Sequence, residues 1–483
     1  MLSYSILKHV TKETKIFVRY KHPSHHWSVL RKKDHPIDKA LNHFDDFYKQ
    51  VFDKKWPSIR KALFAKKKYI AVVNRFGDNI ETISKLESEG ALNMRRLFTL
   101  EKQYIQEEIS EKKRNTALEN IFKLDEMTEK ATENVDPKVT TDNKLSKSSQ
   151  FSLASSLSNA QYDTERLVDG KSFLSPEILH HFIPATKIKG NEDFLPESSH
   201  YKFYDQNIQF AVKSDNEFDI HFPEHLDIYC YEKYNKSDFG NPSKGSTGVY
   251  NYYLMDGGSV LPILALDIKP GHRVLDMCSS PGGKSLLAIQ TLYPECVVSN
   301  DISGSRLDRV ESVYEQFLYD FNEKWLGPGK IKLTLGDARN IVDDNFDRIL
   351  VDVPCTTDRQ SLHENDNNIF KPSRIKERLQ LPELQKELLF HALKLVQKGG
   401  IVVYSTCSLS PIQNDGVVHM ALKQIWEETN MEIVVKDLSP ALLQARSVYE
   451  FADRNLLKYG HLVLPSMSHN YGPTYFCKLK KLK

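Results

Sequence analysis

The sequence predicts an α/β fold in which a doubly wound, mostly parallel sheet follows a small helical N-terminal region. Beyond about residue 245, short β-branched runs alternate with helical patterns, which is typical of a parallel sheet covered on both faces. Earlier, in residues 36–100, apolar side chains such as Ile37, Leu41 and Phe44 recur every three or four positions, which indicates amphipathic helices.

Composition places the chain among ordinary globular proteins. Its 483 residues are enough for two or three domains, and 66 Lys and Arg nearly balance 64 Asp and Glu, which excludes a histone-like or acidic disordered chain. No apolar run reaches the about 20 residues that a bilayer requires, so we expect no membrane span. Six cysteines are too sparse for an extracellular disulfide framework and lack the CxxC spacing of a metal site, so we expect reduced thiols and no metal.

Residues 1–33 form a candidate mitochondrial presequence. They hold eight Lys or Arg but one acid, Glu13, and on a helical wheel the basic side chains lie opposite Leu7, Val10 and Phe17. A basic amphipathic helix is typical of an import signal, which favours the mitochondrial matrix. The alternatives are an ordinary solvated helix or a basic arm that touches RNA.

Two segments separate this presequence from the main domain. Residues 34–100 form the helical N-terminal region, in which Pro57 and Ser58 open a second helix. Residues 101–200 are predicted to be a flexible insertion, because 137–161 is rich in Ser, Thr, Asn and Lys and offers little apolar surface to bury. The main domain is then 201–483, with its sheet core at about 245–480.

The sequence pattern of the main domain predicts alternating strands and helices. Parallel sheets of this kind place ligands at the carboxyl ends of their strands, so the strand ends are the candidate site. The predicted strands are 273–277, 296–300, 331–335, 348–353 and 400–405, and the predicted helices are 284–292, 305–319, 382–397 and 411–427.

The first strand ends in a glycine turn, DMCSSPGGKS at 276–285, where a ligand can approach the backbone and the first amides of a helix. Cys278 stands where a Walker loop needs Gly, and the pattern GxGxxG is absent, so a polyphosphate or dinucleotide ligand is disfavoured. The following strands end in Asp301, Asp337 and Asp352, and an acid about 20 residues after such a turn can bind ribose hydroxyls. A lone Asp is more often a helix cap, but acids at four strand ends favour an adenosine ligand with a cationic tail.

Two of the cysteines also follow strands. Cys355 comes after the fourth strand and Cys407 after the fifth, so both sulfurs are predicted at the edge of the sheet that carries the acids. A lone Cys is usually a small buried hydrophobe, and we keep that interpretation for the other four. Helix amino termini such as the one near Pro411 lower a thiol pKa, and the thiolate is the nucleophile.

Methylation of a pyrimidine at carbon 5 needs this set of groups. Carbon 5 becomes nucleophilic when a thiolate adds at carbon 6, and Asp352, three residues before Cys355, is placed to contact N3. The activated ring can then take a methyl group from a sulfonium donor. The residues alone do not decide which of Cys355 and Cys407 attacks.

At these motifs the sequence resembles the Nop/Sun family of S-adenosylmethionine-dependent RNA cytosine-5 methyltransferases, and within it the members that act on mitochondrial ribosomal RNA. The resemblance covers about 245–480 and includes departures at Asp415, at Ser279 and Ser280, and at Ala338. It rests on DMCSSPGGKS at 276–285, ND at 300–301, GDA at 336–338, VDVPCT at 351–356, YSTCSLSPIQND at 404–415 and YYLMDGGS at 252–259.

The resemblance implies a role for each matching position. Cys407 matches the family's nucleophile, and Cys355 matches the cysteine that assists release of the methylated RNA. Asp352, the catalytic candidate for the N3 contact, also matches a position that holds the methyl donor. The positions that match the family's S-adenosylmethionine contacts are Gly282, Gly283, Lys284, Asp301, Arg306, Asp337 and Asp352.

The expected function is therefore methylation of a cytosine in mitochondrial small-subunit rRNA, with a role in ribosome assembly. The resemblance implies mitochondrial ribosomal subunits and a helical-repeat protein of the mitochondrial termination-factor family as partners. Basic clusters at 31–33, 66–68 and 478–483 are candidate RNA contacts, although such runs are more often simply solvated. Two alternatives stay open: an assembly scaffold whose catalysis is dispensable, and a tRNA cytosine-5 methyltransferase.

Overall fold

The computed structural model describes residues 35–108, 110–111, 212–343 and 345–483. The candidate presequence at 1–33 and most of the predicted insertion lie outside these residues. At the start of that insertion the structure differs from the prediction, because the helix that begins at residue 94 continues through 108. Within the described ranges, no helix has the length and apolar character needed to cross a bilayer.

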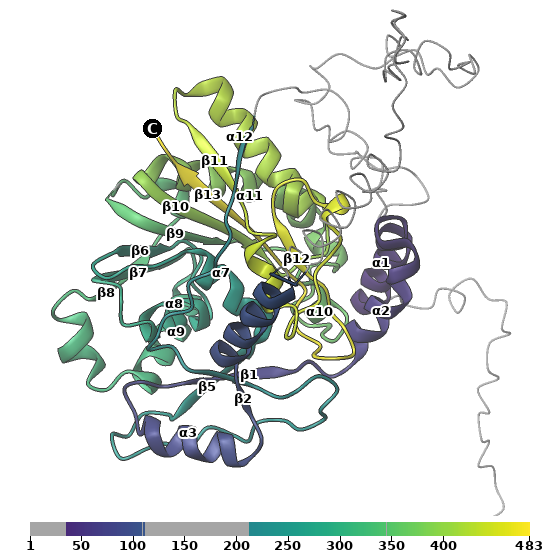
Figure 1. Ribbon diagram of the computed structural model, residues 1–483. Coiled ribbons are helices and arrows are strands. Elements are labelled where there is room, and N and C mark those ends of the chain that lie inside the picture. The colour runs from purple at the N-terminus through teal and green to yellow at the C-terminus, as the bar shows by residue number, and fades with distance from the viewer. Residues whose placement is uncertain (1–34, 109, 112–211, 344) are drawn as a thin grey trace, which may run out of the picture.

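The main sheet runs in the order β3-β11-β13-β10-β9-β6-β7-β8, and β12 pairs with β13 beside this path. The strands from β8 to β10 are parallel, whereas β13 is antiparallel to both β10 and β11. The five predicted strands are confirmed to within a few residues (Figure 1). The bounds are β3 Lys213–Asn216, β6 Arg273–Asp276, β7 Cys296–Asp301, β8 Ile331–Leu335, β9 Phe346–Asp352, β10 Val396–Thr406, β11 Ile433–Asp437, β12 His461–Val463 and β13 Thr474–Lys481.

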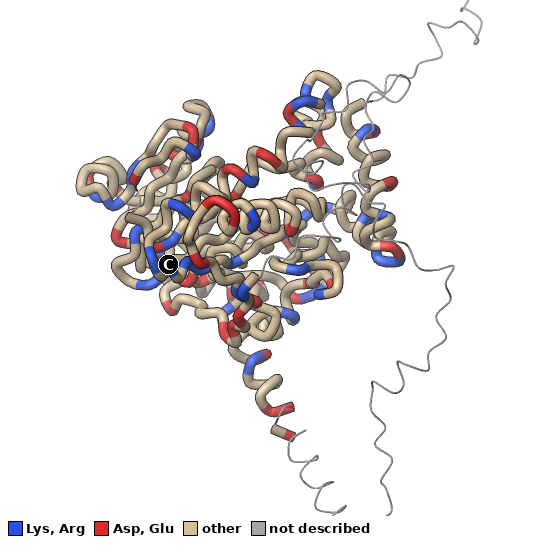
Figure 2. Tube along the Cα trace, turned by 90° about the horizontal axis from the view of Figure 1, so that it is seen from above, with Lys and Arg blue, Asp and Glu red and all other residues tan. Residues whose placement is uncertain are grey.

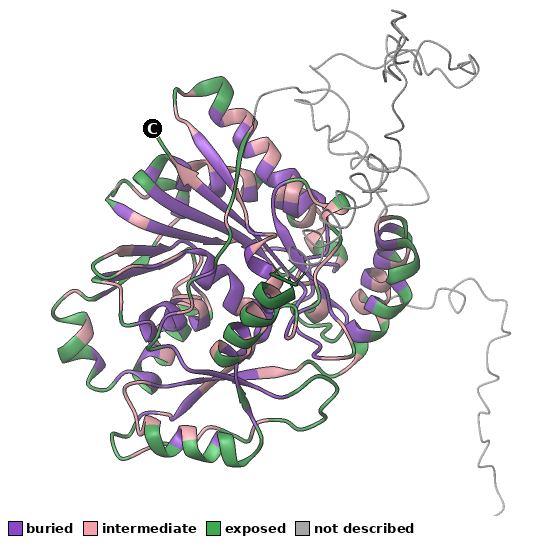
Figure 3. Ribbon diagram, viewed as in Figure 1, coloured by how far each residue is buried: buried purple, intermediate pink, exposed green. Residues whose placement is uncertain are grey.

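Helices cover both faces of this sheet, as a doubly wound fold requires. Along β9, Ile349 and Val351 pack in one apolar cluster and Leu350 in another, because successive strand residues point to opposite faces. The first cluster includes side chains of α1, α11 and α12, and the second those of α7, α8 and α9. Figure 3 shows the strands as a largely buried layer between them. The helices are α1 Pro36–Phe52, α2 Trp56–Phe64, α7 Val260–Ala265, α8 Gly283–Gln290, α9 Gly304–Phe317, α10 Asp358–Ser361, α11 Ile375–Leu395 and α12 Val417–Glu428.

A second, antiparallel sheet corrects the expectation of helix throughout 36–100. Its strands are β2 Leu92–Asn93, β4 Ile228–Cys230, β1 Tyr69–Val73 and β5 Tyr252–Asp256, in that order, with α3 Asn79–Ser88 beside them (Figure 1). The β-branched run YIAVV forms β1 by pairing with β4 and β5, which lie more than 150 residues further along the chain. Such non-local pairing overrides the local helical periodicity.

The N-terminal helices pack directly on the segment that follows β9. Phe44 of α1 meets Phe370 edge to face, with ring centroids 5.3 Å apart. Arg359 donates to Ala62 O at the end of α2 (3.2 Å), and His363 Nε2 lies 2.9 Å from Leu63 O. These bonds join the carbonyls at the end of α2 to the segment after β9, so α2 is fixed against the part of the chain that follows Cys355.

Candidate active site

The glycine turn after β6 has the geometry of a close backbone approach. Gly282 has φ 103°, which L side chains rarely adopt, and a Cβ there would lie 3.3 Å from Val310 Cα. A Cβ on Gly283 would lie 2.9 Å from the Tyr253 hydroxyl of β5. The backbone conformation therefore favours glycine at position 282, and a side chain at position 283 would displace Tyr253.

Asp301, at the end of β7, lies against this turn. Its side chain is 0% exposed and forms an ion pair of 2.9 Å with Arg306. It also accepts from the backbone N–H of Ser303 at 3.0 Å and, more weakly, of Ser280 at 3.4 Å. Asp301 and Arg306, which were assigned separately to the methyl donor, therefore lie together beside the turn.

Asp337 lies at the neighbouring strand end, but its carboxylate is engaged elsewhere. Gly336 N donates to Asp301 O (3.1 Å), which brings the ends of β7 and β8 together. The Arg339 guanidinium lies 2.6 Å from Asp337 and holds the pKa of that carboxyl below its usual range. Beside these acids, Ile302 and Leu335 are 63% and 62% exposed and offer apolar surface for a flat ring.

Lys284 and Asp352 connect the turn to the cysteine loops. Lys284 Nζ lies 2.7 Å from Asp352 Oδ2, and Ser405 donates to Asp352 Oδ1 at 2.7 Å. Burial disfavours the charge on Lys284, but the adjacent carboxylate outweighs burial and raises the pKa of that ammonium group. Ser405 was not among the predicted site residues, although it stands two residues before Cys407 in the same motif.

The two cysteines that sequence analysis selected are in contact. Cys355 Sγ and Cys407 Sγ are 2.9 Å apart, and both thiols are free. The backbone N–H groups of Thr357 and Cys407 point to Cys355 Sγ at 3.4 Å. Cys407 is exposed and Cys355 buried, and the hydrogen bond with Cys355, together with the charge of Asp352, raises the pKa of Cys407. The pair thus holds a proton that must leave before a thiolate can attack.

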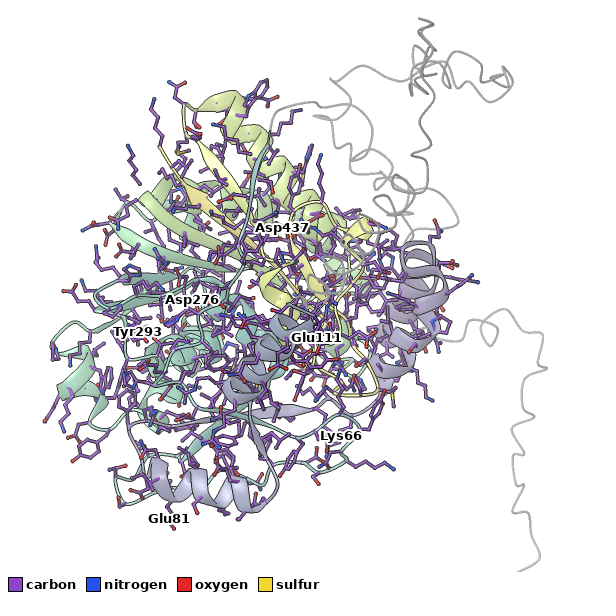
Figure 4. The ribbon with its side chains drawn as sticks, viewed as in Figure 1. Lys66, Glu81, Glu111, Asp276, Tyr293 and Asp437 are labelled. Atoms are coloured by element: carbon purple, nitrogen blue, oxygen red, sulfur yellow. The ribbon has the colours of Figure 1, made fainter. Side chains whose placement is uncertain are left out.

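Asp276, the first of the four strand-end acids, is also buried, although no contact with the methyl donor was assigned to it. It is 2% exposed, Ser285 donates to its Oδ2 at 2.5 Å, and its Oδ1 has no partner among the described residues. Burial raises the pKa of Asp276 to about 7. Figure 4 labels it in the interior of the main domain, at the carboxyl end of β6. Its position at the end of a predicted strand was the sequence feature that indicated a place in the site.

The basic clusters at 66–68 and 478–483 are partly engaged in ion pairs, whereas the cluster at 31–33 lies outside the described residues. Lys66 and Lys68 both pair with Asp238, and Lys478 is 2% exposed and bonds to Glu217 at 2.6 Å. Burial, opposed by Glu217, lowers the pKa of Lys478. Figure 2 shows Lys and Arg interspersed with Asp and Glu over the described chain. Lys478 is therefore a structural residue and not the predicted RNA contact.

The sheet order, with its reversed strand beside β11, and the acid-lined turn next to two cysteines define a Rossmann-like methyltransferase. Residues 263–470 match the family model of 16S rRNA methyltransferase RsmB/F. The 5-cytosine rRNA methyltransferase nsun-4 of Caenorhabditis elegans is 31% identical over 93% of this chain and 92% of its own length. The 5-cytosine rRNA methyltransferase NSUN4 of Xenopus tropicalis is 33% identical over 92% and 90%.

A more distant relative is a mitochondrial tRNA (cytosine(34)-C(5))-methyltransferase of Danio rerio, which is 36% identical over 48% of this chain and 61% of its own length. Because two full-length relatives exceed 30% identity, the chain belongs to the Nop/Sun family of RNA cytosine-5 methyltransferases. It is an rRNA cytosine-5 methyltransferase, which confirms the class of reaction predicted from the two cysteines and the strand-end acids.

Proposed function

We propose that the protein transfers a methyl group from S-adenosylmethionine to carbon 5 of a cytosine in mitochondrial small-subunit rRNA, through a Cys407 adduct at carbon 6. The observation that carries the proposal is the contact of Cys355 and Cys407, 2.9 Å apart, beside the Lys284–Asp352 pair. Two thiols at this separation can address one base.

The residues around the glycine turn fit S-adenosylmethionine. Asp276 Oδ1 is buried without a partner, which suits a ligand that brings hydrogen-bond donors. Asp301 offers a carboxylate for ribose hydroxyls, and Ile302 and Leu335 offer apolar surface for an adenine ring. The ion pair of Asp337 with Arg339 leaves its carboxylate less available to the donor than that of the other acids. The residues assigned to the donor are Gly282, Gly283, Lys284, Asp301, Arg306, Asp337 and Asp352.

In the proposed reaction, the Cys407 thiolate forms a bond to carbon 6, and the electron pair of the 5,6 double bond moves into the ring. Asp352, held by Lys284 and Ser405, contacts the N3 edge of the base by accepting from the exocyclic amino group, and the Lys284 ammonium group beside it offsets the negative charge that develops in the ring. S-adenosylmethionine, when bound, supplies the electrophilic methyl group. The carbon 5 proton then passes to a base, the bond between Cys407 and carbon 6 breaks, and Cys355, within contact of the leaving sulfur, assists release.

The assignment of the two thiols is tested by the covalent intermediate. We expect Cys355→Ala to accumulate an adduct between protein and RNA, seen as a denaturing-gel shift, and Cys407→Ala to form none. Cys296→Ala, on a buried residue at the start of β7, is the control and should turn over like the native chain. An adduct in Cys407→Ala, with none in Cys355→Ala, would reverse the assignment.

The mitochondrial setting belongs to the same proposal. The basic amphipathic pattern at 1–33 supports import into the matrix, and the names of the full-length relatives support rRNA as the substrate. A helical-repeat protein of the termination-factor family would bring the enzyme to the ribosomal subunit. Import, followed by affinity purification of a carboxyl-tagged chain, tests location and partner together; cytosolic residence or absence of ribosomal subunits contradicts it.

The Danio rerio relative favours tRNA as the second candidate substrate. Bisulfite sequencing of mitochondrial RNA, with and without this protein, separates the two: loss of a methylated cytosine in small-subunit rRNA supports the proposal, and loss in tRNA alone supports the alternative. Rescue of subunit assembly by Cys407→Ala would instead indicate a scaffold whose catalysis is dispensable.

A further inference from the structure

A buried carboxylate, Asp358, lies beneath both cysteine loops. It is the first residue of α10 and is 0% exposed. Its Oδ2 accepts from the Tyr48 hydroxyl of α1 and from Leu409 N, each at 2.7 Å. One side chain therefore joins three segments that are far apart in the sequence.

The residues that directly follow the two cysteines converge on this carboxylate. Thr356, after Cys355, donates to Asp358 Oδ1 at 2.5 Å, and the hydroxyl of Ser408, after Cys407, lies 3.2 Å from both oxygens of Asp358. The Thr356 and Ser408 hydroxyls are also 2.8 Å from each other. The closed set of bonds among these three side chains fixes one cysteine loop relative to the other.

We propose that Asp358 is a positioning residue that sets the separation of the Cys355 and Cys407 sulfurs, and so couples attack by one thiol to release by the other. The inference deepens the proposed two-cysteine mechanism and rests on it. A carboxylate suits this place because it can accept from Tyr48, Leu409 N and both loop hydroxyls at once, whereas an amide presents a donor at one of its two positions.

Tyr48 extends the arrangement to the N-terminal region. Its ring packs on Trp56 at 5.5 Å, and its hydroxyl reaches Asp358 from α1. The N-terminal helices thus support the geometry of the active site, in addition to covering the sheet. This explains why a catalytic centre formed by β9 and β10 includes a contact from a segment about 300 residues earlier.

The test uses the full chain without RNA, so that it reports geometry even if the assigned chemistry is wrong. Diamide takes two electrons and two protons from the Cys355 and Cys407 thiols, which form a disulfide while diamide becomes the corresponding hydrazine. We expect Asp358→Asn to slow this disulfide by about tenfold, since displacement of reacting atoms by about 1 Å can cost 100-fold in rate. Thr356→Val and Ser408→Ala, which each remove one hydroxyl, should slow it in the same direction.

The control is Asp227→Asn. Asp227 is also a buried carboxylate, 5% exposed, but it pairs with Arg75 and Arg95 beside the antiparallel sheet. It should keep the native rate of disulfide formation. Iodoacetamide labelling of Cys407 in each variant separates a change in thiol reactivity from a change in the distance between sulfurs.

With RNA, Asp358→Asn should retain adduct formation but lengthen the lifetime of the adduct, because release needs the second thiol in place. Native rates of disulfide formation in all three variants would overturn the proposal. If Asp358→Asn does not fold, Thr356→Val and Ser408→Ala decide the outcome. Slowed disulfide formation in the variants, together with no adduct even in the native chain, would count against the two-cysteine mechanism and leave the positioning geometry standing.

Discussion

The Lys284 ammonium group lies 2.7 Å from Oδ2 of Asp352 and joins the glycine turn to the loop that carries Cys355. The side chains of the two residues are 19% and 25% exposed, so water screens the pair only in part. The second oxygen of Asp352 accepts from Ser405, on the strand that leads to Cys407. A single ion pair therefore connects the proposed methyl-donor site to both cysteine segments.

Lys284→Met removes the cation and keeps the length of the side chain. The Asp352 carboxylate would lose its ion pair, and the negative charge that develops on the ring would no longer be offset, so we expect adduct formation to slow by about 100-fold, as for other lost electrostatic contacts. Rapid-quench measurement of the adduct gives the rate, and calorimetry gives the affinity for S-adenosylmethionine. Ser405→Ala, which removes one neutral bond, should have a smaller effect; equal losses would show that charge is not the main contribution.

Much of this arrangement was predictable because the strands are parallel. The ends of three strands carry Asp301, Asp352, Cys355 and Cys407, and the carboxyl ends of parallel strands share one edge of the sheet. Local sequence patterns were therefore enough to bring the acids and the thiols to the same edge.

Other features depend on contacts that no local pattern carries. The strand β1 forms only with partners beyond residue 228, and Asp358 becomes important only when Tyr48 and Leu409 reach it. Similarly, Asp415, where the family usually has Glu, accepts from Gly460 N at 3.0 Å and holds the loop before β12. Asp415 therefore has a structural role, although it departs from the family pattern.

The pH dependence of iodoacetamide labelling at Cys407 should depend on the hydrogen bond with Cys355. The hydrogen bond with Cys355 raises the pKa of Cys407, so in the native chain the thiolate becomes abundant only above the pH at which an ordinary thiol ionises. We expect Cys355→Ala to move the midpoint of iodoacetamide labelling at Cys407 to lower pH, and to accelerate labelling at pH 7, as measured by peptide mass spectrometry. Cys296→Ala should leave the midpoint unchanged. A midpoint that rises in Cys355→Ala contradicts the inferred hydrogen bond.

The short distance between Gly283 and Tyr253 predicts that the effect of a substitution at one residue is partly reversed by a substitution at the other. A Cβ at this position would lie 2.9 Å from the Tyr253 hydroxyl, and that ring packs on Phe317 with centroids 5.2 Å apart. Gly283→Ala should therefore displace the turn and weaken binding of S-adenosylmethionine by about tenfold, on the scale of overpacking costs of 1–3 kcal/mol. Tyr253→Leu in the same chain should restore part of that affinity, with Tyr253→Leu alone as the control. Purely additive losses in the double variant would exclude a steric cause.

Asp276 should make the stability of the fold depend on pH in an unusual direction. Burial raises its pKa from the ordinary 3.8 to about 7, so the folded protein keeps a proton that the unfolded chain has already lost. Stability from this group is therefore fully present below about pH 4 and is lost as the pH rises through about 7.

In Asp276→Asn the group cannot ionise, and the Asn oxygen can still accept from Ser285. Between pH 5 and pH 8 the native chain should lose about 2 kcal/mol more unfolding free energy than the variant, by urea denaturation without ligand. Other titrating groups cancel in this difference, and equal pH slopes for the two chains would show that Asp276 is ionised in the folded protein at pH 5.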